Sequence, residues 1–198
     1  MYENENFIMA IHLVQLQDSL QAETGAAAKL RADSSPGAWG SRKGDVELKD
    51  NTGKRLNEAQ FEHHPAGLGR SDFDLKVRDA DGKIILTTQG RLSPKGMGDR
   101  EINAQTRDAS GKLIYEIHED LHAAGMGKTR VDMQIKGADG RILSTTQGEA
   151  VPHGMNRIEF KFNTRDGHGK QIIDGKLNIE PAGWGAASLE GEISFPNH

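Results

Sequence analysis

Apolar and polar residues alternate with a period of two along several short stretches of the chain. In residues 72–78, and again in residues 130–136, every second residue is apolar and those between are polar or charged. A period of two is typical of a β-strand that buries one face. The pattern therefore predicts strands in these stretches and in a third, residues 159–163. Their apolar positions are Phe73, Leu75, Val77, Val131, Met133, Ile135, Phe160 and Phe162.

Each of these strands runs into a short polar turn that ends in glycine and a basic residue. In Asp79-Ala80-Asp81-Gly82, the first carboxylate can accept a backbone N–H, and glycine stands where φ must become positive. Between two strands this turn is typical of a hairpin with a type I turn and a bulge. The five copies of the turn end at Gly53-Lys54, Gly82-Lys83, Gly111-Lys112, Gly140-Arg141 and Gly169-Lys170.

A second motif, rich in proline and glycine, recurs at the same spacing. Its copies begin at residues 36, 65, 94, 123, 152 and 181, a constant step of 29 residues. A fixed period of this size indicates a tandem structural repeat. The repeat also accounts for much of the glycine content, which is 24 of 198 residues. The copies of the motif are Pro36–Gly40, Pro65–Gly69, Pro94–Gly98, Ala123–Gly127, Pro152–Asn156 and Pro181–Gly185.

The strand after each polar turn changes the parity of its apolar positions. One apolar set is Leu56, Ile85, Ile114, Leu143 and Ile172, and a later set of opposite parity is Leu92, Leu121, Ala150 and Ile179. A β-bulge between the two sets would return both to one buried face. We place this bulge at the stretches Thr87–Gly90 and Thr145–Gly148, which lie two units apart.

The chain is predicted to be all-β: tandem antiparallel hairpins of 29 residues, about twelve strands, closed into a barrel or a two-layer sandwich. A parallel β-helix would also give a constant period, but the glycine-closed turns favour hairpins. Residues 1–35 form a degenerate N-terminal segment, and residues 36–198 the repeat domain, within one domain overall. Phe7–Leu20 fits either a helix or a strand. Leu189–Phe195 restarts a unit and then stops, as expected of a closing strand.

Composition removes several classes of function. A net charge of −4 and a pI near 6.1 argue against a binder of nucleic acid or anionic membranes held by a basic face. The absence of cysteine excludes disulfides, Cys-ligated zinc and a thiol nucleophile. No transmembrane stretch and no secretory signal is seen, so we expect a cytoplasmic protein or one exported without a cleaved signal. No cofactor is expected.

One motif points to metal chemistry. His118-Glu119-Asp120-Leu121-His122 matches H-E-x-x-H and resembles the zinc site of metzincin peptidases, which implies His118 and His122 as ligands and Glu119 as general base. Lys128 stands at the position of the third ligand, where an ammonium group cannot bind zinc. The repeat also places the segment on a strand, where residues four apart are about 13 Å apart. The zinc hydrolase is therefore kept as an alternative, although Lys128 and the strand spacing both argue against it.

Three further histidines, His64, His122 and His153, lie near the proline- and glycine-rich loops of their units. A metal held across neighbouring loops is one interpretation of this spacing. Exposed polar loop residues are the other.

The loops share one large apolar residue per unit, between small residues. This column could present a row of equivalent contacts to a partner, or it could plug one end of the barrel or sandwich. Its members are Trp39, Leu68, Met97, Met126, Met155 and Trp184. We take them as the candidate binding residues.

The leading hypothesis is a non-enzymatic β-repeat scaffold whose repeated loops bind a glycan or a protein, with avidity arising from repetition. A barrel that carries a small hydrophobic ligand is the alternative. A third possibility is an assembling protein that pairs its end strands with other copies of itself.

Overall fold

The computed structural model describes residues 27–154, 157–181 and 186–195. The stretch Phe7–Leu20, predicted as helix or strand, lies outside the described residues. Among the described residues no helix is long and apolar enough to cross a membrane. The helical element within them is η2 (Ala38–Gly40), a single 3-10 turn.

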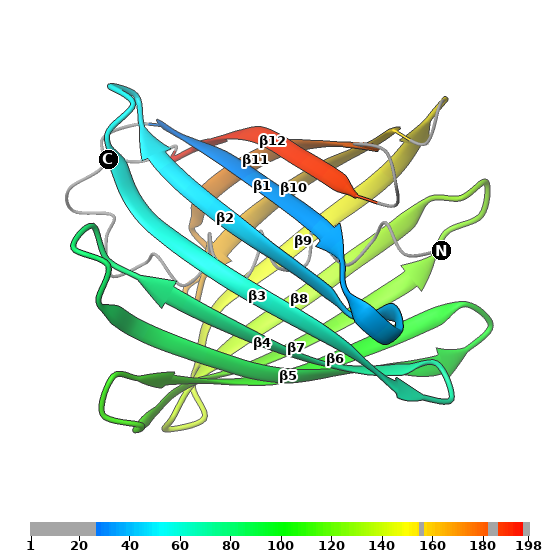
Figure 1. Cartoon of the computed structure of the whole chain (residues 1–198), viewed down its shortest axis with the longest axis horizontal. Coiled ribbons are helices and arrows are strands. Elements are labelled where there is room, and N and C mark those ends of the chain that lie inside the picture. The colour runs from blue at the N-terminus through cyan, green and yellow to red at the C-terminus, as the bar shows by residue number, and fades with distance from the viewer. Residues whose placement is uncertain (1–26, 155–156, 182–185, 196–198) are drawn as a thin grey trace.

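Twelve antiparallel strands form one closed barrel, in which each strand pairs with its neighbours in the sequence (Figure 1). This confirms the all-β hairpin prediction and decides for the barrel over the sandwich. The strands are β1 (Ala27–Pro36), β2 (Arg42–Asp50), β3 (Arg55–Gly67), β4 (Arg70–Arg78), β5 (Ile84–Gly96), β6 (Asp99–Asp108), β7 (Leu113–Ala123), β8 (Thr129–Gly137), β9 (Ile142–His153), β10 (Arg157–Asp166), β11 (Gln171–Pro181) and β12 (Ala187–Ser194).

The barrel closes between β1 and β12. The two strands pair antiparallel, with Ala32 opposite Leu189 and Ala28 opposite Ile193. The terminal half-unit is thus the closing strand, as its sequence indicated. Its partner β1 lies almost wholly inside the segment 1–35 that the sequence pattern set apart as degenerate, so part of that segment is a full member of the barrel wall.

The polar turns have the predicted hairpin geometry. In the turn between β4 and β5, the Asp79 carboxylate accepts the N–H groups of Asp81 and Lys83 at 3.0 and 2.9 Å. The N–H of Gly82 donates to the Asp79 carbonyl at 3.0 Å, with Gly82 at φ +81°. Asp50, Asp108 and Asp166 cap their turns in the same way.

The bulge lies closer to the turn than the sequence pattern indicated. In the β4–β5 ladder Val77 faces Leu86 and Arg78 faces Ile84, so Ile85 is the extra residue. The prediction of a bulge at Thr87–Gly90 was wrong, because the apolar residue that breaks the parity is itself the residue outside the ladder. Its equivalents skipped in the other hairpins are Leu56, Ile114, Leu143 and Ile172.

All twelve strands contribute inward side chains to one hydrophobic core, whose members are at most 9% exposed. Phenylalanine rings lie over inward-facing glycines of neighbouring strands. A Cβ at Gly90 would be 2.3 Å from Cζ of Phe73, and one at Gly148 would be 2.5 Å from Cζ of Phe160. At these glycines the missing side chain leaves room for an aromatic ring from the neighbouring strand. This packing favours curvature of the wall.

Candidate functional site

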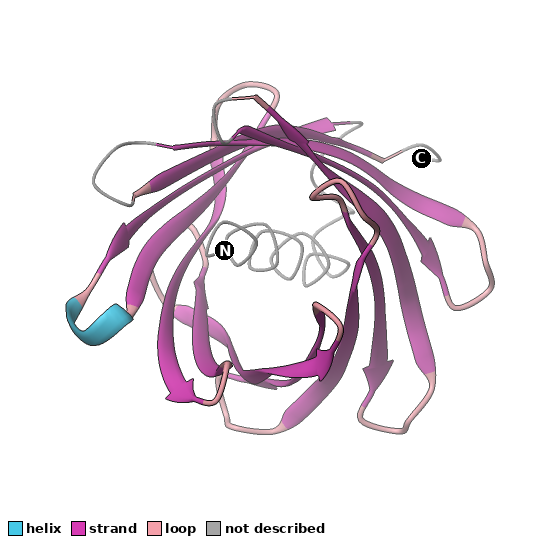
Figure 2. Ribbon diagram, turned by 90° about the vertical axis from the view of Figure 1, so that its right-hand side faces the viewer, coloured by secondary structure: helices cyan, strands magenta, loops and turns pink. Residues whose placement is uncertain are grey.

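The proline- and glycine-rich loops meet at one end of the barrel. In an antiparallel meander every second connection lies at the same end, so the loops after β1, β3, β5, β7, β9 and β11 share one rim, which faces the viewer in Figure 2. The polar, Asp-capped turns occupy the other rim. The loops at this rim form a ring, to which Leu68, Met97 and Met126 belong.

Three of the six candidate binding residues have described side chains, and all three are at the tips of their loops. Leu68, Met97 and Met126 are 91%, 102% and 92% exposed, which makes them the most exposed large apolar residues of the described part of the chain. We call these three residues the tips. Met155 and Trp184 lie outside the described residues, and Trp39 is placed only by its backbone in η2.

The backbone holds each tip in the left-handed region. Leu68, Met97 and Met126 have φ of 51°, 50° and 50°, and the glycine after each also has positive φ. Positive φ at both central residues makes these turns type I′. The ladder confirms the two-residue loops, because Gly67 pairs with Arg70 and Gly96 with Asp99.

Leucine and methionine are poor choices for this backbone. The first central position of a type I′ turn favours Asn, Asp or Gly, since a left-handed L-residue costs about 1–2 kcal/mol. A fully exposed apolar side chain also gains nothing from the core. Two unfavourable features therefore coincide at the same residue in three successive repeats, and neither is offset by a contact within the barrel wall.

These positions decide between the two interpretations of the column. The plug interpretation is wrong for Leu68, Met97 and Met126, because side chains that are almost fully exposed are not packed into the end of the barrel. Their role as binding residues stays a prediction.

The H-E-x-x-H motif lies on β7, and the strand separates its residues. Glu119 is fully buried on the inner face, whereas His118 and His122 are outward and partly exposed. The glutamate and the histidines therefore lie on opposite faces of the wall and do not form the zinc-peptidase arrangement. No group of three or more His, Cys, Asp or Glu side chains in the described residues could hold a metal ion.

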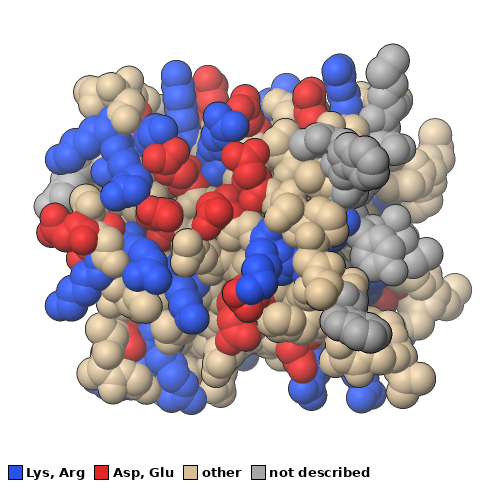
Figure 3. Space-filling model, viewed as in Figure 1, with Lys and Arg blue, Asp and Glu red and all other residues tan. Residues whose placement is uncertain are grey.

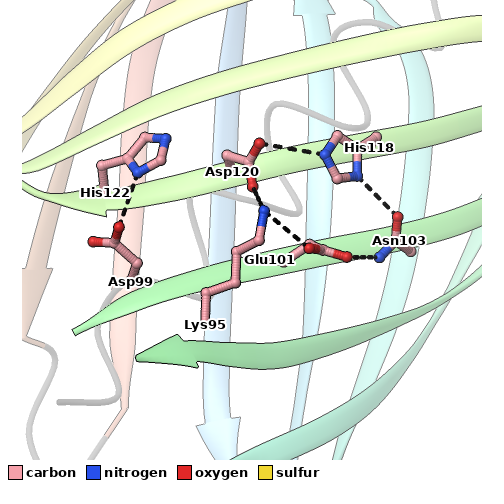
Figure 4. Close-up of polar contacts among 7 residues, drawn as sticks. All are labelled: Lys95, Asp99, Glu101, Asn103, His118, Asp120 and His122. Atoms are coloured by element: carbon pink, nitrogen blue, oxygen red, sulfur yellow. Dashed lines mark hydrogen bonds and ion pairs between the residues drawn. The ribbon is translucent and has the colours of Figure 1, made fainter. Parts of the chain in front are cut away.

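The outward residues of the motif belong instead to a surface network (Figure 4). Lys95 Nζ lies 2.7 Å from Asp120 Oδ1 and 3.0 Å from Glu101 Oε2, and His118 Nε2 lies 3.3 Å from Asp120 Oδ2. Hydrogen bonds to Asp120 and Glu101 raise the pKa of Lys95, and the hydrogen bond from Lys95 lowers the pKa of Asp120. Half-exposed pairs of this kind contribute little to stability.

The other loop histidines do not converge. His122 Nδ1 lies 3.1 Å from Asp99 Oδ2, and His64 Nε2 lies 3.5 Å from Glu62 Oε2 on its own strand. Each therefore has a local carboxylate partner within its own hairpin or strand. The metal across neighbouring loops is not formed by the residues described.

The outer wall carries hollows that the sequence did not indicate. One, of about 1020 Å³, lies over β8–β12 and β1, and a second, of about 600 Å³, lies over β4–β8. Nearly all residues that line the smaller hollow have a counterpart two repeats later in the larger one, as for Gln89 with Gln147 and His118 with Lys176. Basic and acidic side chains are interspersed over the wall (Figure 3). The hollows are thus a feature of the repeated wall.

No protein-family model matches the chain, and no curated protein matches it. The site is therefore interpreted from its own geometry.

One buried histidine gives a pH-dependent prediction. His63 faces the interior from β3, and burial lowers its pKa below the ordinary 6.5. A lowered pKa means that the stability present above pH 6.5 is lost as the pH falls toward the folded-state pKa, because the unfolded chain takes up the proton first. We expect urea unfolding at pH 5.5 and 7.5 to differ less for His63→Leu than for the native chain. An unchanged difference in His63→Leu would contradict the assignment.

Proposed function

We propose that the protein is a non-enzymatic binding scaffold that contacts its partner through the ring of apolar loops. The observation that carries the proposal is the backbone of Leu68, Met97 and Met126: exposed apolar side chains held in left-handed turns. A rigid hairpin array fixes the loops relative to one another, so a partner meets several equivalent contacts at once.

The aliphatic chemistry of the tips favours an apolar partner surface over a glycan. Sugars stack on aromatic rings, and the three tips with described side chains carry none. The lectin form of the hypothesis therefore depends on Trp39 and Trp184 alone. The carrier alternative stays a prediction.

Photo-crosslinking tests the scaffold proposal in the native cells. A benzophenone amino acid at Met97 should give adducts, whereas the same amino acid at Ser110, an exposed turn residue of the opposite rim, should give few. The two sites lie on opposite rims, and each of them is in a hairpin turn. Equal labelling from both rims, or none from Met97, would refute binding through this ring.

A further inference from the structure

Basic residues flank the apolar ring along the sequence, and three of them form ion pairs with carboxylates of the wall. Within three residues of the six ring positions the sequence has six lysines and arginines but one acidic residue, Asp99, although the whole chain has a net charge of −4. We call these six the basic collar. They are Arg42, Arg70, Lys95, Arg100, Lys128 and Arg157.

Carboxylates hold several collar residues against the barrel wall. Lys128 Nζ lies 3.4 Å from Glu149 Oε1, and Arg157 Nε lies 3.4 Å from Glu180 Oε1. Glu149 lies on β9, the neighbour of β8, which begins directly after Lys128. Glu180 lies on β11, the neighbour of β10, which begins at Arg157. The cations thus flank the loops, while Leu68, Met97 and Met126 point beyond them.

This order, apolar groups in front and cations behind, matches the layers of an anionic membrane surface. Acyl chains accept apolar side chains at the headgroup boundary, and lipid phosphates lie above them. Each Lys or Arg near such a surface strengthens binding about fivefold. We propose that the ring docks on an anionic lipid bilayer, with the tips at the acyl boundary and the basic collar at the phosphates. This rests on the proposed function and names its partner.

The geometry favours a bilayer over the other occupants. Neighbouring loops are two strands apart, so their tips are separated by about 10 Å or more. A protein partner would need a separate pocket for each tip, whereas a lipid surface accepts them all without matched pockets.

Vesicle flotation with the full chain tests the proposal. We expect binding to vesicles of phosphatidylcholine with 30% phosphatidylserine, and much weaker binding to phosphatidylcholine alone. Changing Leu68, Met97 and Met126 together to asparagine should lower the partition coefficient at least tenfold, because three apolar contacts are lost. Ile142→Thr, which changes an exposed apolar residue at the other rim, should bind as the native chain does.

Two double variants that remove the same charge distinguish an effect of the basic collar from an effect of net charge. Arg70→Gln with Lys128→Gln should weaken binding at least fivefold, and Lys54→Gln with Lys83→Gln, an equal change of charge at the opposite rim, should not. Binding should also fall with added salt.

Each of the following outcomes would overturn the lipid proposal. They are native protein that stays off anionic vesicles, an asparagine variant that still binds them, and a native dimer that the asparagine change dissociates without vesicle binding. Crosslinks from Met97 to protein alone, with no vesicle binding, would overturn the lipid partner and leave the scaffold function standing.

Discussion

Replacing Leu68, Met97 and Met126 with asparagine is expected to stabilise the protein, by about 1 kcal/mol at each site. Asparagine tolerates the left-handed backbone that these tips adopt at φ near 50°. The sites lie on separate loops, so their effects should add to about 3 kcal/mol. The free energy of unfolding in urea measures this directly.

Alanine at the same three positions is the matched control. It removes the apolar side chain but keeps a Cβ, without the local hydrogen bonds that help asparagine in this region. The alanine variant should therefore lie near the native stability and well below the asparagine variant. An asparagine variant less stable than the native chain would show that the tips stabilise the barrel, contrary to their exposure.

Replacing Gly148 with alanine is expected to destabilise the barrel by about 1–3 kcal/mol, the usual cost of overpacking a core. Its new Cβ would lie 2.5 Å from Cζ of Phe160 and 2.9 Å from the carbonyl oxygen of Lys161. Neither atom can retreat easily, since one belongs to a buried ring and the other to a strand. Urea unfolding gives the difference.

Gly154→Ala is the control for this change. No atom lies within 4 Å of a Cβ built at Gly154, and its φ is not positive. Its stability should stay near the native value, because the added methyl group meets nothing. Pairing Gly148→Ala with Phe160→Leu should recover part of the loss. If Gly148→Ala alone is as stable as the native chain, the ring of Phe160 does not pack against this glycine.

The repeat and its turns could be predicted from sequence because they depend on local chemistry. An aspartate that caps backbone N–H groups and a glycine with positive φ are both specified within four residues, as at Asp79 and Gly82. Closure is a long-range property. The pairing of β1 with β12 joins residues more than 150 positions apart, so the period alone left barrel and sandwich open.

The sequence identified the candidate residues by their position in the repeat, but it did not show whether their side chains are buried or exposed. Apolar residues between glycines fit both a buried plug and an exposed tip, since hydropathy does not report direction. The deciding fact is the exposure of Leu68, Met97 and Met126. Similarly, the net charge of −4 concealed the basic collar, because acidic residues elsewhere on the wall outweigh it.

The H-E-x-x-H motif shows the limit of a local pattern in the other direction. Its chemistry requires a helix, on which His118 and His122 share a face with one turn between them. The repeat places the motif on β7, where Glu119 faces inward. Periodicity across the whole chain was therefore a better guide than a motif that fixes three residues.

We propose that the tips are kept for contact with a partner at the expense of stability. The most direct test measures two quantities on the triple asparagine variant: its free energy of unfolding and its bound fraction on anionic vesicles. The account predicts a variant that is more stable than the native chain and binds at least tenfold less. A variant that is more stable and still binds as the native chain does would contradict it.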